Sequence, residues 1–160
     1  MGALRVYMDA SVFGGYFDDE FSDVSVHLFD VLLRGKVVAL ISDTLVGELV
    51  DAPECVQDLL QQVLHVGVER IPANEEAEYL RDRYLAARIL TAKYGDDALH
   101  VAHATVARAD VIVSWNFRHL VNPPRIRAFN GVNIASGYGV VSIMTPADIV
   151  KIVEEDDDRP

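Results

Sequence analysis

A helix followed directly by a short strand is the feature that most constrains how this chain folds. Apolar residues recur at the helical period over 96–106, and the pair Asp96 and Asp97 enters the first turn, where the helix dipole favours negative charge. The β-branched run 110–114 then predicts a buried strand. Helix and strand together would bring Asp97 and Asn116 to one edge of a sheet, and that edge is the candidate functional site.

The rest of the chain repeats this alternation of strand and helix. Strands are predicted at 5–8, 36–41, 110–114 and 140–144, with 67–71 either a strand or a turn, and helices at 23–34, from 44, from 53, at 74–90, from 96 and from 146. Gly14 and Gly15, with the acids at 18–20, predict a flexible loop, and Pro123 and Pro124 predict an irregular segment. The expected fold is a single α/β domain with a mainly parallel central sheet flanked by helices.

Length and composition favour one globular domain. A chain of 160 residues, 51% of them apolar, can bury one core but is short for two ordinary domains. The domain is expected to span residues 1–153, and the acid-rich segment 154–160 to be a disordered tail. No apolar run approaches the roughly 20 residues of a membrane span, and no signal peptide is evident, so a cytoplasmic protein is expected. The single Cys55 excludes an internal disulfide.

The net charge of −11 constrains the kind of partner. A polyanion would be repelled unless divalent cations bridge it to the acids or a local basic patch holds it. Arg118, Arg125 and Arg127 form the densest basic cluster and follow the candidate site, so they are predicted to contact substrate phosphates. Ordinary scattered surface arginines are the alternative.

Oxygen-bearing side chains recur where predicted strands end. Asp9 follows the first strand, Glu48 lies one turn into the helix after the second, and Asn116 follows the strand at 110–114. With Asp97 they make a set of hard oxygen ligands that suits Mg²⁺ or Mn²⁺, and such an ion supports phosphodiester hydrolysis. Asp9 and Asp97 are predicted as principal ligands, with Glu48 completing or orienting the shell. Asp9 could instead cap a turn, and Glu48 could be a solvent-facing helix residue.

Other polar residues near these acids have two interpretations each. Ser11 could hold Asp9 through a hydrogen bond or line the substrate site. His100 could bond to Asp97 one turn away, although a simply packed or exposed histidine is commoner, and His103 lacks the partners for a zinc site. Trp115 could stack on a base or belong to the core.

Four segments, taken in order, resemble the PIN-domain family and in particular VapC-type toxin ribonucleases. They are 6–11 (VYMDAS), 44–49 (TLVGEL), 97–104 (DALHVAHA) and 113–117 (VSWNF). The resemblance implies a PIN-like fold, endoribonuclease activity on RNA, a homodimer, and a cognate antitoxin protein that covers the site. Asn116 stands where many family members have an aspartate; its carbonyl oxygen can still coordinate, but it brings no charge.

Two alternatives to a ribonuclease remain from the sequence. A haloacid-dehalogenase-like phosphatase also places an aspartate after its first strand, but it needs a second aspartate where this chain has Ser11. A catalytically weak or inactive RNA- or protein-binding module is the stronger alternative, because Asn116 replaces an acid.

Overall fold

Five parallel strands form the centre of the molecule. In the computed structural model, which describes residues 2–159, the strands are β1 (Leu4–Met8), β2 (Val37–Ser42), β3 (Glu69–Ile71), β4 (Val111–Val113) and β5 (Ser142–Met144). Their order in the sheet is β3-β2-β1-β4-β5, with Tyr7 of β1 in register with Leu40 on one side and Ile112 on the other. The predicted α/β fold with a parallel central sheet is confirmed.

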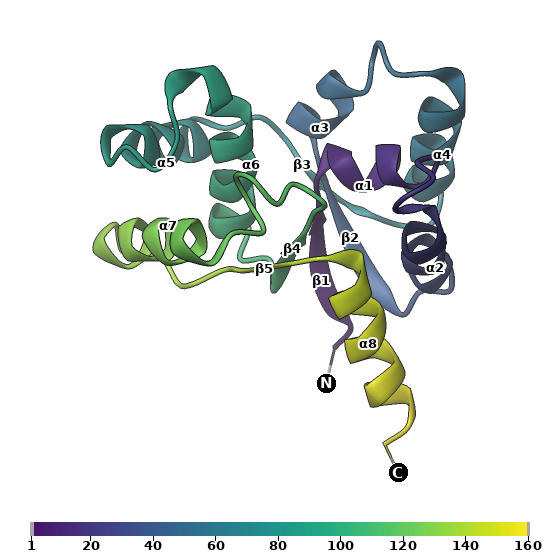
Figure 1. The fold of residues 1–160 in the computed structure, drawn as a ribbon. Coiled ribbons are helices and arrows are strands. Elements are labelled where there is room, and N and C mark those ends of the chain that lie inside the picture. The colour runs from purple at the N-terminus through teal and green to yellow at the C-terminus, as the bar shows by residue number, and fades with distance from the viewer. Residues whose placement is uncertain (1, 160) are drawn as a thin grey trace.

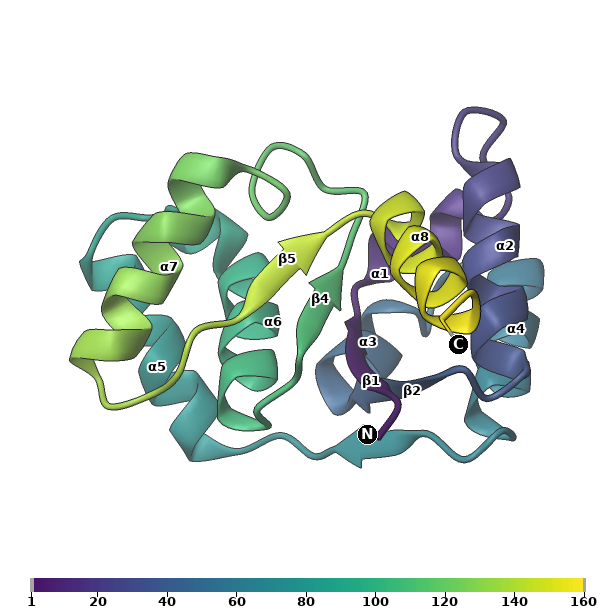
Figure 2. The same cartoon turned by 90° about the horizontal axis from the view of Figure 1, so that it is seen from below.

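Helices cover both faces of this sheet (Figures 1 and 2). One side carries α5 (Glu75–Ala86), α6 (Gly95–Val106) and α7 (Pro123–Ala135), and the short 3₁₀ helix η1 (Ala92–Tyr94) precedes α6. The other side carries α1 (Ala10–Gly15), α2 (Ser22–Leu33), α4 (Glu54–Leu64) and α8 (Pro146–Asp157), while α3 (Asp43–Glu48) follows β2. Strands buried on both faces explain the nearly continuous apolar runs in the sequence.

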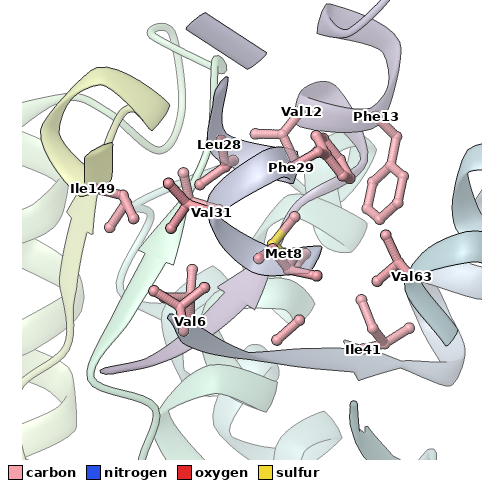
Figure 3. Packing of buried hydrophobic residues seen from close by; sticks show 14 of the residues in the cluster. Val6, Met8, Val12, Phe13, Leu28, Phe29, Val31, Ile41, Val63 and Ile149 are labelled. Carbon is pink, nitrogen blue, oxygen red and sulfur yellow. The ribbon is translucent and has the colours of Figure 1, made fainter. Parts of the chain in front are cut away.

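The alternation of side chains along β1 divides the core into two clusters. Val6 and Met8 point to the face covered by α1, α2 and α4, where they meet Phe29 and other apolar side chains (Figure 3). Tyr7 points to the opposite face, where Tyr84 belongs to the second cluster. Burial on both faces holds β1 rigidly in the centre, so the backbone at its end is well placed to position a functional group.

Two local predictions were wrong, each for an identifiable reason. Residues 10–15, expected to run into a flexible loop at the two glycines, form helix α1, because Val12 and Phe13 are buried in the core. Pro123 and Pro124 begin α7 instead of excluding regular structure, because proline is tolerated in the first helical turn. Helix α8 runs as far as Asp157 and so includes part of the acidic segment 154–160.

Alanine substitutions at the neighbouring residues Gly15 and Gly14 should have different effects on stability. A Cβ atom at Gly15 would lie 2.7 Å from Cδ1 of Trp115, whereas nothing lies within 4 Å of one at Gly14. We expect Gly15→Ala to destabilise the protein by about 1–3 kcal/mol through displacement of the indole. Gly14→Ala should be neutral or stabilising by up to about 1 kcal/mol, since alanine favours a helix. Denaturant unfolding followed by Trp115 fluorescence measures both, and equal effects of the two substitutions would contradict the packing described.

No helix within residues 2–159 is both long enough and apolar enough to cross a bilayer.

Candidate functional site

The candidate site lies where the strand order of the sheet reverses. The chain moves from β1 outwards to β2 and β3, then returns to place β4 on the other side of β1. In open parallel sheets a crevice forms at this point, beyond the carboxyl ends of the two central strands. Asp9 follows β1 and Ser114 follows β4, and Asp9 N donates to Val113 O at 3.3 Å. The two segments are therefore fixed side by side.

Asp9 is buried and held by two hydroxyl groups. Its Oδ2 accepts hydrogen bonds from Ser11 Oγ at 2.7 Å and from Ser114 Oγ at 2.6 Å. Ser11 Oγ also accepts from the backbone N–H of Trp115 at 2.8 Å. Of the two roles considered for Ser11, the geometry gives it that of holding Asp9 in place.

Asp97, in the first turn of α6, is held by the loop that follows β4. Its Oδ2 lies 2.8 Å from His119 Nδ1 and accepts from Asn116 Nδ2 at 3.3 Å. The other end of the Asn116 amide, Oδ1, accepts from the backbone N–H of His119 at 3.0 Å, and Asn116 N donates to Ser114 Oγ at 2.9 Å. Asn116 therefore links the hydrogen bonds around Asp9 to those around Asp97, and its carbonyl oxygen is already engaged.

Glu48, at the end of α3, is paired with a buried histidine. Its Oε1 accepts from Nε2 of His100, whose Nδ1 lies 2.6 Å from Tyr7 Oη. Tyr7 Oη in turn lies 2.7 Å from Ser42 Oγ, the side chain that caps α3. His100 thus bonds to Glu48 and not to Asp97, and a chain of buried polar groups fixes it.

The three carboxylates act on one imidazole. Burial favours a lower pKa of His100, but the hydrogen bond to Glu48 and the negative charges of Asp9, Glu48 and Asp97 outweigh burial, so the pKa is raised. An imidazolium donates from both nitrogens, to Tyr7 and to Glu48. The charges of all three acids therefore favour the protonated form of this one buried group.

The donor set fits a hard divalent cation in chemistry. Each carboxylate uses one oxygen for the bonds described, while Asp9 Oδ1, Asp97 Oδ1 and Glu48 Oε2 accept no hydrogen bond from residues 2–159. Metal-ligating carboxylates commonly have this arrangement, in which hydrogen bonds orient one oxygen and the other oxygen is free. Within the same residues, no three His, Cys, Asp or Glu side chains are close enough to ligate one ion together. A cation would thus have to keep waters and take phosphate oxygens, as Mg²⁺ does.

The predicted basic cluster is divided in the structure. Arg118 is exposed and its Cζ lies 5.4 Å from the centre of the Tyr94 ring, which itself contacts His119. Arg125 and Arg127 lie on α7, and no contact joins their side chains to the acids within the described residues. Trp115 donates its indole N–H to Ser25 Oγ at 2.8 Å and stacks on Phe21, so it packs within the protein.

Sequence reasoning missed three residues that position the acids. Ser114 had a usable signal, since it directly follows a predicted strand in the same way as Asp9. His119 reaches Asp97 only because the chain turns sharply after Asn116, and Tyr7 reaches His100 only through tertiary packing. Neither of these two contacts has a pattern in the sequence.

His103 gives a prediction about acid stability. It is buried, with Nε2 3.0 Å from Thr44 Oγ1 and Nδ1 without a partner in residues 2–159, and burial, together with the positive charge of His100, lowers its pKa to about 4. In the unfolded chain this histidine has a pKa near 6.5, so between pH 6.5 and 4 the unfolded state binds a proton that the folded state does not. The free energy of unfolding therefore decreases as the pH falls through this range, by on the order of 3 kcal/mol. The free energy of unfolding, measured across this pH range, should fall more steeply with decreasing pH for the wild type than for His103→Gln. Equal slopes would contradict the assignment.

Comparisons with known proteins agree with this architecture. No protein-family model matches the sequence, and no curated protein matches it. A chain from a solved structure, described as VapBC2 from Rickettsia felis bound to a DNA fragment from the VapBC2 promoter, superposes on this chain with a TM-score of 0.57 and 16% sequence identity. The match covers 88% of this chain and 98% of that one. This chain has a PIN-like fold. At this identity the likeness is one of fold, and the function has to be argued from the side chains.

Proposed function

We propose that this protein is a metal-dependent endoribonuclease of the VapC type, the toxin of a toxin–antitoxin pair, which hydrolyses RNA phosphodiester bonds with Mg²⁺ or Mn²⁺. The observation that supports the proposal is the hydrogen-bonded connection of Asp9 to Asp97 through Ser114 and Asn116, with Glu48 bonded to His100, where the strand order of a PIN-like sheet reverses. Hard oxygen donors at such a crevice suit a cation that binds phosphate.

Each residue of the site has a distinct role in this proposal. Asp9 and Asp97 supply the principal oxygen ligands, and Glu48 completes or orients the shell. A bound Mg²⁺ supplies polarisation of the scissile phosphate and a lowered pKa of attacking water. Ser11, Ser114 and His119 hold the ligating carboxylates, and Asn116 connects the two halves of the site without contributing charge.

The proposed partners are RNA, a cognate antitoxin and a second copy of this chain. The solved relative in fold is a VapBC2 assembly, which supports a search for an antitoxin encoded next to this gene. Co-purification of a neighbouring small protein with this chain, and loss of RNA cleavage in that complex, is the expected result. Light scattering on the isolated protein tests the homodimer.

A cleavage assay tests the proposed activity. Purified protein is incubated with total RNA in Mg²⁺, in Mn²⁺ or with chelator, and the new RNA ends are mapped. We expect cuts at defined positions with either metal and none with chelator. Absence of cleavage with every metal would reject the enzyme.

A non-catalytic RNA- or protein-binding module is the second candidate. It is favoured by the absence, within residues 2–159, of three metal-ligating side chains close enough for one ion, and by Asn116 in place of an acid. Binding of RNA or antitoxin without cleavage in any metal would establish it.

A further inference from the structure

Two cationic side chains lie against one tyrosine ring beside the site. Tyr94 is partly exposed at the end of η1, and Lys93 Nζ lies 5.5 Å from the centre of its ring. Arg118 Cζ lies 5.4 Å from the same centre but comes from the loop between β4 and α7. The electron-rich face of an aromatic ring attracts a cation at this distance. Tyr94 thus interacts both with its neighbour Lys93 and with an arginine from a distant segment.

Both cations lack an acidic partner in a strongly acidic protein. The chain has 25 Asp and Glu residues against 14 Lys and Arg. Ion pairs within residues 2–159 engage six of those basic residues, but none includes Lys93 or Arg118, and neither side chain donates a hydrogen bond there. Both are exposed, so their N–H groups are available to an external anion. The six paired residues are Arg5, Arg34, Lys36, Arg70, Arg81 and Arg159.

Direct contacts connect this pair of cations to the acids. The Tyr94 ring centre lies 4.1 Å from that of His119, and His119 Nδ1 lies 2.8 Å from Asp97 Oδ2. The two cations are therefore connected to Asp97, the carboxylate predicted to ligate the metal, through the Tyr94 ring and His119.

We infer that Lys93, Tyr94 and Arg118 form a cation clamp that binds a backbone phosphate of single-stranded RNA next to the phosphate being cut. The inference rests on the proposed function and names how its substrate is held. Arg118 offers a planar fork of donors that matches phosphate oxygens, and Lys93 adds a compact charge. The clamp supplies a local attraction that offsets the repulsion between RNA and a chain of net charge −11. Tyr94 positions the cations.

Binding measured without cleavage tests the clamp. The probe is a fluorescently labelled single-stranded RNA oligonucleotide, titrated with protein in chelator at several salt concentrations starting from low ionic strength, and followed by anisotropy. Lys93→Ala and Arg118→Ala are compared with Lys151→Ala and Arg83→Ala, which remove the same charges from exposed positions on α8 and α5. Each clamp variant should bind about 5-fold more weakly and lower the slope of log K against log salt by about 0.7, while the controls match the wild type.

Tyr94 distinguishes a positioned clamp from two independent charges. Tyr94→Phe keeps the ring and should retain the wild-type affinity and salt slope. Tyr94→Leu removes the ring and should weaken binding about 2- to 5-fold without changing the net charge. Thermal unfolding of each variant checks that the fold is intact.

The outcomes separate the clamp from the nuclease. Failure of the wild type to bind the RNA, or clamp variants that behave like Lys151→Ala and Arg83→Ala, would overturn the clamp, even if the cleavage assay is positive. Clamp-dependent binding together with no cleavage in any metal would reject the nuclease and keep the clamp as an RNA-binding surface.

Discussion

Asp97→Asn should reduce RNA cleavage by at least about 100-fold, because loss of a ligating charge costs more than the 10- to 100-fold typical of the groups that support a ligand. The fold should survive. An asparagine oxygen has the same shape and can still accept from His119 and Asn116, which hold the carboxylate now. Initial rates on a defined single-stranded RNA in Mn²⁺ measure the effect.

The matched control is Asp96→Asn. Asp96 is the neighbouring acid in the same helical turn, is exposed, and makes no ion pair within residues 2–159. It should retain nearly full activity. If both variants cleave at the wild-type rate, Asp97 does not hold the catalytic metal, and a loss shared equally by both would indicate a general charge effect.

His100→Leu should have the largest effect on stability among the site residues. His100 is fully buried between Tyr7 and Glu48, and leucine has a similar size but removes both hydrogen bonds. Tyr7 Oη keeps its bond to Ser42 Oγ, and the exposed Glu48 carboxylate can bond to water, so we expect a loss of about 1–3 kcal/mol in denaturant unfolding. Cleavage should fall about 10- to 100-fold, since Glu48 loses its only protein hydrogen bond among the described residues.

His65→Leu is the control for that measurement. His65 is exposed at the end of α4, and its substitution should change the unfolding free energy by no more than about 0.5 kcal/mol. A loss for His100→Leu no larger than this would show that the hydrogen-bonded chain from Ser42 to Glu48 contributes little to the stability of the fold.

Local patterns were enough to predict the fold and the positions of the acids. Asp9 after β1 and Asp97 in the first turn of α6 follow from apolar periodicity and from the rule that side chains gather beyond the carboxyl ends of parallel strands. The start of α7 could also have been predicted, because Asn122 is a favourable N-cap residue and proline is tolerated in the first helical turn. The prediction failed because the prolines were interpreted only as helix breakers.

Contacts between distant segments could not be predicted in this way. The pairing of Glu48 with His100 depends on how α3, which packs on β2, and α6, which packs on β4, are placed relative to each other, and no spacing in the sequence encodes it. The division of the arginines, with Arg118 beside Tyr94 and the other two on α7, depends on the path of the loop after Asn116. These tertiary contacts give the acids their orientation, so the chemistry of the site depends on them.

Anomalous diffraction from crystals soaked in Mn²⁺ tests most directly whether the acids share a cation. The expected result is a manganese peak beside the carboxylates of Asp9 and Asp97, with Glu48 completing or orienting the shell through water. A structure with no manganese at that edge of the sheet, or with these carboxylates directed to separate surfaces, would contradict the account.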